Sequence, residues 1–262
     1  MHRFYLPPES CRRDELFLTG SEAHHALHVV RVRRGQSIAV LDGIGHELVC
    51  NVQQSDRDKI RLCVRERKTA AIPPCRITLL QAVPKGKLLE AIIQKATELG
   101  AARIVPILSE RVVVHLNKNE AVRKAAKWQS IAVEAIKQCG AAWLPRVETP
   151  MTPEEFLVRK EHFDLALIGS LQPGAKHPRE YLRHPGQPKS AAIWVGPEGD
   201  FTPTELEAIK ASGAYPITLG PLVLRTETAA IYCLSIVNYE LGSDPKELAR
   251  MPSLRPSAEP RE

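Results

Sequence analysis

The sequence predicts an α/β protein in which a small β-rich unit precedes a mostly parallel sheet. Residues 1 to about 70 contain short runs in which charged and apolar residues alternate, typical of half-buried strands joined by tight turns. From Cys75 onward, continuously apolar runs alternate with helical patterns, which indicates parallel strands buried on both faces. A length of 262 residues is enough for both units.

The N-terminal unit is expected to be a meander or a small barrel over residues 1–72. Its predicted strands are 37–41, 46–52 and 59–65. Ser21 is expected to cap a short helix over 22–31, because its hydroxyl can accept a hydrogen bond from the first turn. The Pro-containing segment 70–74 reads as the linker to the second unit.

The second unit is predicted over residues 73–245, followed by a polar, Pro-rich segment 246–262 that we expect to be disordered. Its predicted strands are 76–83, 104–108, 164–169, 191–195 and 215–219. Helices are expected at 88–99 and at about 120–138. Two capping boxes with proline at the first helical position begin at Thr152 and Thr202.

Composition excludes several classes of protein. No apolar stretch approaches the roughly 20 residues of a membrane span, and the N-terminus has no apolar core of signal-peptide type, so we expect a cytoplasmic protein. The six cysteines never form C-x-x-C, which argues against a disulfide framework and against a zinc site. A net charge of +6 is compatible with a polyanionic partner but does not establish one.

Three glycine-bearing loops follow predicted strands, at 167–170, 196–199 and 219–225. Ligands of open α/β sheets bind beyond the carboxyl ends of the strands, and glycine lets the backbone approach a ligand closely. Any single loop is explained as a tight turn, but three in one unit predict a shared pocket. Neither phosphate-loop pattern is present, so we expect backbone groups and leucines to hold an adenosine-like ligand.

Two of these segments carry a resemblance to a known family. Gly196-Pro197-Glu198-Gly199, taken with the pattern Leu219-Gly220-x-x-x-Leu224-Arg225-x-Glu227-Thr228-Ala229, resembles the SPOUT superfamily of knotted methyltransferases. Over residues 2–240 the chain is similar to the RsmE family, with matching segments at 2–5, 25–35 and 95–100. That family methylates N3 of a uridine in 16S ribosomal RNA and uses S-adenosylmethionine as the methyl donor.

The resemblance implies a PUA-like N-terminal domain that helps to bind RNA, and a SPOUT domain whose C-terminal part forms a trefoil knot. It further implies a homodimer without a metal, acting on 16S ribosomal RNA or on the small ribosomal subunit. The expected cofactor-binding residues are Ile168, Gly169, Gly196, Pro197, Glu198, Gly199, Leu219, Gly220, Leu222, Leu224, Arg225, Thr228 and Ala229.

Methyl transfer to uracil N3 requires particular side chains near the cofactor. The sulfonium supplies an activated methyl group, so the protein has to align uracil N3 and accommodate the loss of its proton. Arg225 is expected to stabilise the negative charge that develops on the uracil, or to bind the adjacent phosphate. Glu198 or Glu227 is a candidate base, although either also suits a role in holding a turn or pairing with Arg225. The residues expected to contact RNA are Arg3, Arg31, Arg33, Arg34, Lys85, Lys87 and Arg111.

The chain departs from the family pattern at two places. The usual Glu-Gln-x-x-Arg at the end of the long helix is Lys137-Gln138-Cys139-Gly140-Ala141, and the usual Arg-Ser is Arg111-Val112. We expect these changes to redistribute contacts with RNA or with the partner subunit. Two alternatives stay open: a SPOUT enzyme with another target, such as the ribose 2′-O position of transfer RNA, and a non-catalytic RNA-binding assembly factor.

Overall fold

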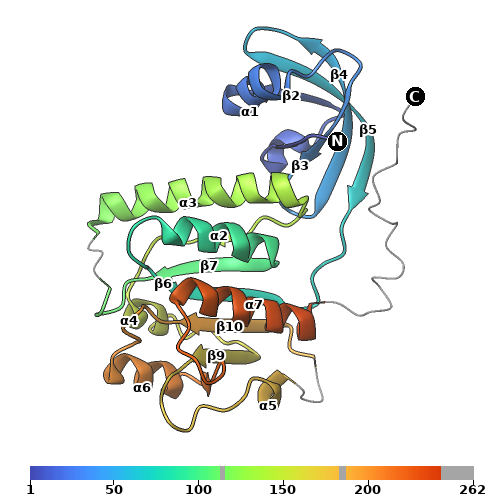
Figure 1. The fold of residues 1–262 in the computed structure, drawn as a ribbon. Helices are drawn as coiled ribbons and strands as arrows, with labels where there is room; N and C mark the ends of the chain where they lie inside the picture. Colours follow the sequence, from blue (N-terminus) through green and yellow to red (C-terminus); the bar gives the residue numbers. More distant parts are fainter. Residues whose placement is uncertain (113–115, 183–186, 243–262) are drawn as a thin grey trace.

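The computed structural model describes residues 1–112, 116–182 and 187–242, which form two sheets and the helices that cover them (Figure 1). The N-terminal sheet has the order β1-β3-β4-β5-β2. Its strands are β1 (Arg3–Tyr5), β2 (Glu15–Thr19), β3 (Ser37–Leu41), β4 (His46–Ser55) and β5 (Lys59–Thr69). The three strands predicted here are confirmed, whereas β1 and β2 were not predicted. β1 runs parallel to β3, and the other neighbours are antiparallel.

A short helical segment covers this sheet, where the sequence predicts one. It consists of α1 (Gly20–His24) and the π-helical turn η2 (His25–Val30), and a 3-10 turn, η1 (Pro8–Cys11), lies earlier in the chain. Ala23 and Ala26 pack into the N-terminal core. The predicted capping residue is wrong: Thr19 occupies the N-cap position and its side chain makes no capping bond, because the helix begins one residue before Ser21.

The second sheet is entirely parallel and has the order β11-β9-β10-β6-β7-β8. Its strands are β6 (Arg76–Ala82), β7 (Ala101–Ile107), β8 (Arg146–Val147), β9 (Leu165–Gly169), β10 (Ser190–Val195) and β11 (Tyr215–Ile217). All five predicted strands of this unit are present, with ends that shift by up to three residues. The parallel arrangement places the carboxyl ends of these strands at one edge of the sheet, where the sequence predicts the pocket.

Helices cover both faces of the parallel sheet. They are α2 (Leu88–Glu98), α3 (Lys118–Cys139), α4 (Pro153–Leu157), α5 (Arg179–Leu182), α6 (Pro203–Ala211) and α7 (Thr226–Leu241). One apolar cluster joins α2, α3 and α7 to one face of the sheet, and a second joins α4 and α6 to the other. The capping boxes at Thr152 and Thr202 are confirmed, and a third, at Asn117 with Glu120, begins α3.

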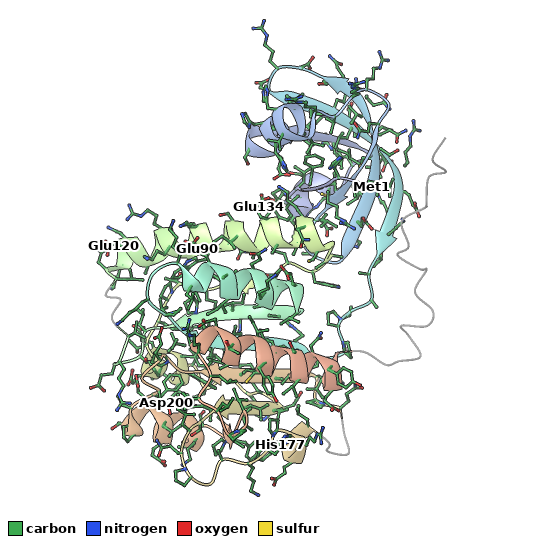
Figure 2. All side chains as sticks on the ribbon, in the orientation of Figure 1. Met1, Glu90, Glu120, Glu134, His177 and Asp200 are labelled. Atoms are coloured by element: carbon green, nitrogen blue, oxygen red, sulfur yellow. The ribbon has the colours of Figure 1, made fainter. Side chains whose placement is uncertain are left out.

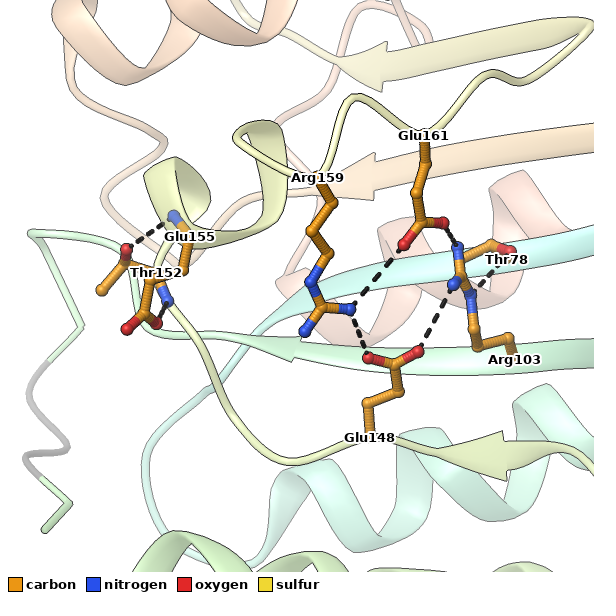
Figure 3. A network of polar contacts seen from close by, with 7 residues as sticks. All are labelled: Thr78, Arg103, Glu148, Thr152, Glu155, Arg159 and Glu161. Carbon is orange, nitrogen blue, oxygen red and sulfur yellow. Dashed lines mark hydrogen bonds and ion pairs between the residues drawn. The ribbon is translucent and has the colours of Figure 1, made fainter. Parts of the chain in front are cut away.

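An ion-pair network stabilises the chain beside α4 (Figure 3). Glu148, which is nearly buried, accepts from Arg103 at 3.3 Å and from Arg159 at 2.8 Å. Arg103 also donates to Glu161 at 2.5 Å. The hydrogen bond from Arg103 is the main reason that the pKa of Glu161 is lowered. The network therefore links β7 to the segments that follow β8 and α4.

The N-terminal sheet is attached to the parallel unit through the turn between β3 and β4. Gly45 donates its N–H to the Ala142 carbonyl at 2.9 Å, and Leu144 donates to the Gly43 carbonyl at 2.9 Å. Gly45 has a positive φ of 104°, and a Cβ there would lie 2.6 Å from the ring of Trp143. These contacts, at the end of α3, hold the two sheets in a defined relative position.

Lys137, one of the departures from the family pattern, contributes to the same attachment. Its side chain is nearly buried and bonds Glu22 of α1 at 2.7 Å and Glu134 at 2.8 Å. Burial would lower the pKa of Lys137, but the hydrogen bonds that its ammonium donates to the two carboxylates outweigh burial and raise the pKa. Lys137 therefore contributes to the contact between α3 and the N-terminal sheet.

Candidate functional site

Three loops at the carboxyl edge of the parallel sheet line a cavity that is open to solvent on one side, at the place where open α/β sheets bind their ligands. They are the loops that follow β9 and β10 and the segment that leads into α7. The lining residues are Gly169, Ser170, Leu171, Val195, Gly196, Pro197, Glu198, Asp200, Leu219, Gly220, Leu222, Val223, Leu224, Thr226 and Ala229. The pocket predicted from three glycine-bearing loops is therefore present.

The turn after β10 is held at both ends by residues outside it. The Thr226 hydroxyl donates to the Gly196 carbonyl at 2.7 Å, and Arg111 Nη1 donates to the Gly199 carbonyl at 2.5 Å. Within the turn, the Asp200 N–H donates to the Pro197 carbonyl at 2.9 Å. These hydrogen bonds give the turn a defined shape in the absence of a ligand.

Close packing explains the first glycine of this turn. A Cβ on Gly196 would lie 3.1 Å from Asp200 Oδ1 and 3.3 Å from Phe201 Cδ2. Asp200 itself has a positive φ of 61°, and its carboxylate accepts the N–H of Phe201 at 2.8 Å. A side chain at position 196 would therefore push against the residues that follow the turn, and glycine avoids this contact.

The opposite wall is formed by the segment from Leu219 to Thr226. Gly220 has a φ of 114°, which L side chains rarely adopt, so glycine is needed here for conformation. Leu222 and Val223 are largely exposed, at 73% and 75%, beside the cavity. This wall therefore offers apolar side chains to a ligand.

The structure brings most of the predicted cofactor residues to the cavity but leaves some outside its lining. Ile168 is fully buried in the core, next to Trp194. Gly199 and Arg225 are exposed beside the cavity, and Arg225 occupies the N-cap position of α7. Thr228 lines a separate groove along α7, and Glu227 is half-buried in the first turn of that helix.

The sequence reasoning missed Ser170, Leu171, Val195, Asp200, Val223 and Thr226. Ser170 and Val223 lie within the predicted loops 167–170 and 219–225, and extending the loops by one position would have found Leu171, Val195 and Asp200. Thr226 is different: it begins α7, and its hydroxyl points to a carbonyl 30 residues earlier in the chain. No local pattern in the sequence predicts that contact.

The charges of the cavity limit the kind of ligand. Among the described residues that line it, the only charged side chains are Glu198 and Asp200. A cavity with carboxylates and no lysine or arginine in its wall does not suit a phosphate-bearing ligand. It suits a ligand with an apolar or aromatic part and a positive charge.

The basic residues predicted to contact RNA fall into two groups. Arg31, Arg33 and Arg34 are exposed on the N-terminal unit, which lies at the opposite end of the molecule from the cavity (Figure 1). Figure 2 labels Asp200 of the cavity at the lower end of the molecule and Glu134 on α3, beside the N-terminal unit. Arg3 packs its guanidinium on Gly140 and lies 3.9 Å from Glu47.

The second group lies at the same edge of the sheet as the cavity. Lys85 and Lys87 are exposed in the loop that follows β6, and Arg111 is exposed after β7. Since β6, β7 and β10 are parallel, these loops leave the sheet on the side of the Gly196 turn. A polyanion bound here would lie next to the cavity.

Cysteine chemistry contributes nothing at this site. All six cysteines are unpaired. Burial raises the pKa of the Cys233 thiol to about 12 and that of Cys75 to about 11, so neither is a nucleophile at neutral pH. The described part of the chain contains no cluster of three or more His, Cys, Asp or Glu side chains placed to bind a metal. Within the same residues, no helix has the length and apolarity to cross a membrane.

Comparison with protein-family models defines the class. The family model described as an RNA methyltransferase domain matches residues 72–238. A second model, described as an RNA methyltransferase PUA domain, matches residues 18–62. The cavity, with loops from β9, β10 and β11, lies within the first of these matches.

Relatives define the particular family. The ribosomal RNA small subunit methyltransferase E of Bacillus subtilis is 32% identical over 85% of this chain and 89% of its own length. That of Mycobacterium bovis is 34% identical over 83% of this chain and 84% of its own length. The chain therefore belongs to the ribosomal RNA small subunit methyltransferase E (RsmE) family of RNA methyltransferases.

Solved structures agree with this assignment. A putative methyltransferase from Legionella pneumophila, solved with the bound cofactor SAM, has a TM-score of 0.82 and 32% identity over 90% of this chain and 96% of its own. The ribosomal RNA small subunit methyltransferase E of Neisseria gonorrhoeae, bound to S-adenosyl methionine, has a TM-score of 0.82 and 29% identity over 92% of this chain and 98% of its own. The predicted resemblance to the RsmE family is confirmed.

Proposed function

We propose that this protein transfers a methyl group from S-adenosylmethionine to N3 of a specific uridine in 16S ribosomal RNA. The observation that carries the proposal is the cavity bounded by the Gly196–Asp200 turn and the Leu219–Thr226 segment, in a chain that belongs to the RsmE family. The uridine position comes from the resemblance to that family.

The cavity fits the chemistry of the donor. Adenosine requires apolar contacts and backbone hydrogen bonds, which Leu219, Leu222 and Leu224 and the adjoining backbone can supply. The sulfonium carries a positive charge, and the charged groups of the described lining are carboxylates. When bound, the cofactor supplies an activated methyl group, so the protein acts by binding and alignment.

Arg225 is the side chain that we propose for charge stabilisation at the uracil. It is exposed at the N-cap of α7, directly after the lining residue Leu224 and directly before Thr226. A guanidinium there is available to a substrate that approaches the open side of the cavity, where it would stabilise the uracil anion or bind the adjacent phosphate. Glu198 lines the cavity, which favours it over Glu227 as the group that takes the N3 proton.

RNA binding is proposed for two basic surfaces. Arg31, Arg33 and Arg34 of the N-terminal unit would contact phosphates at a distance from the target base, and Lys85 and Lys87 would contact phosphates beside it. The target base itself would be turned out of its stack to present N3. Since the N-terminal surface lies far from the cavity of the same chain, an extended RNA or a second subunit has to connect them.

The finer architecture is also a proposal. We take residues 1–72 as a PUA-like domain and 73–245 as a SPOUT domain, with a trefoil knot in its C-terminal part and a homodimer as the working form. The match to the PUA domain ends at residue 62 and the match to the RNA methyltransferase domain begins at residue 72, which supports a division into two units. A substrate in the small ribosomal subunit would place the protein in the cytoplasm.

Transfer of a labelled methyl group tests the function. The purified protein would be incubated with labelled S-adenosylmethionine and either undermethylated small subunits or naked 16S ribosomal RNA. We expect incorporation into one of these substrates and none into transfer RNA. Incorporation into transfer RNA alone would favour another SPOUT activity, and failure to bind the cofactor would favour an assembly factor.

A further inference from the structure

Gln81 is a fully buried polar residue in an otherwise apolar stretch of the central strand β6. Leu79, Leu80 and Ala82 around it are also fully buried. Gln81 lies near the carboxyl end of the strand, in register with Val195 of β10, the residue that immediately precedes the Gly196 turn. An apolar side chain would satisfy packing at this position, so the amide has to be explained by its hydrogen bonds.

The amide makes two hydrogen bonds, and both come from its nitrogen. Gln81 Nε2 donates to the Ala82 carbonyl at 3.0 Å and to the Thr226 hydroxyl at 2.9 Å, while Gln81 Oε1 has no partner among the described residues. Exchanging the nitrogen and the oxygen would put two acceptors, Oε1 and the Ala82 carbonyl, against each other. The contact with Ala82 therefore fixes the orientation of the amide.

This orientation also fixes the direction of the next hydrogen bond. Because the Thr226 oxygen accepts from Gln81, its proton is available to the Gly196 carbonyl, which lies 2.7 Å away. The chain of donors thus runs from Gln81 through Thr226 to Gly196. It joins β6, the start of α7 and the turn after β10, and both Thr226 and Gly196 line the cavity.

We propose that Gln81 is a positioning residue of the cofactor site, which acts through the Thr226 hydroxyl to hold the carbonyl of Gly196 in the cavity wall. The inference rests on the proposed function, because it concerns the same site. With the Gln81 amide in place, the Thr226 hydroxyl has one orientation, and the two walls are fixed relative to each other before the cofactor binds. Such pre-organisation lowers the cost of ordering the site on binding.

The test compares affinities for S-adenosylmethionine by calorimetry in the full-length protein. Gln81→Met removes the amide at similar volume, and Thr226→Val removes the hydroxyl at the same shape. We expect each to weaken binding about five- to tenfold, as the loss of one hydrogen bond would. Because both act on the same chain, the double variant should be no weaker than the single ones. Thr226→Ser, which keeps the hydroxyl, should recover most of the affinity.

A matched control separates positioning from general stability. Thr97 is as buried as Thr226, at 2% exposure against 3%, and its hydroxyl donates to the Ile93 carbonyl of α2 at 2.8 Å. Thr97→Val should lower the melting temperature much as Thr226→Val does and leave cofactor affinity unchanged. In steady-state assays, Gln81→Met should raise KM for the cofactor and leave KM for RNA at the wild-type value.

The outcomes distinguish this inference from the proposed function. Wild-type protein that binds no S-adenosylmethionine would remove both. Wild-type binding with an unchanged affinity in Gln81→Met, or with additive losses in the double variant, would overturn the positioning role alone. Gln81→Leu provides the same comparison should the methionine variant not fold.

Discussion

Gly196→Ala is the perturbation whose cost the structure defines most directly. A Cβ on Gly196 would lie 3.1 Å from Asp200 Oδ1, 3.3 Å from Phe201 Cδ2 and 3.4 Å from Asp200 Cα. Asp200 cannot give way easily, since its carboxylate already accepts the N–H of Phe201. Overpacking of this kind costs about 1–3 kcal/mol. We take the lower half of that range, about 1–2 kcal/mol, as the free energy needed to restore the shape of the turn when the cofactor binds. This free energy corresponds to an affinity for the cofactor about 5- to 30-fold weaker.

Gly199→Ala is the matched control in the same turn. Neither glycine has a positive φ, so both backbones accept alanine. The Cβ of Gly199→Ala would meet only the Arg111 side chain, at an ordinary 3.5 Å. Calorimetric titration with S-adenosylmethionine should therefore show a loss for Gly196→Ala and an affinity close to that of the wild type for Gly199→Ala. Equal affinities in the two variants, or a larger loss for Gly199→Ala, would refute the packing argument.

Three further changes test other parts of the molecule. Arg225→Ala should reduce single-turnover methylation by about 100-fold with both substrates saturating, as for the loss of one group that stabilises transition-state charge; near-normal turnover would remove its proposed role. Arg111→Ala should weaken cofactor binding a few-fold in the absence of RNA, because it loses the bond to Gly199; a loss confined to RNA affinity and its salt dependence would instead assign Arg111 to RNA. Glu161→Gln should destabilise the protein at pH 7, with the difference from the wild type shrinking as pH falls below about 4.5. A carboxylate whose pKa is lowered in the folded state stabilises the protein above the unfolded pKa, and this stabilisation is lost as pH falls through the folded pKa. Chemical denaturation at pH 7 and pH 3 measures the difference in unfolding free energy between the variant and the wild type. A difference that does not change with pH would contradict the prediction.

Local patterns in the sequence predicted local structure well. Apolar runs marked five of the six strands of the parallel sheet, all but the two-residue β8, and Thr202 with Glu205 marked the start of α6 through a capping box. Asn117 and Glu120 form the same kind of capping box, so α3 begins at Lys118, two residues before the predicted start at about residue 120. β1 and β2 were not predicted: β1 has three residues, and the alternation of exposed and buried residues in β2 extends over five residues.

The contacts that shape the site could not be predicted, because they join residues distant in sequence. Gln81 and Thr226 are 145 positions apart, and Arg111 and Gly199 are 88 apart. The order of the strands, with β6 between β10 and β7, brings these pairs together. Sequence reasoning identified glycine-bearing loops as pocket walls, but the groups that hold the walls in place depend on tertiary packing.

Mass spectrometry of the modified nucleoside is the measurement that tests the central claim most directly. Small subunits methylated by the purified protein with S-adenosylmethionine would be digested to nucleosides and the modified base mapped in 16S ribosomal RNA. The proposed reaction predicts 3-methyluridine at a single position, absent when the protein is omitted. A 2′-O-methylated nucleoside, or no methylated product from a protein that binds the cofactor, would contradict it.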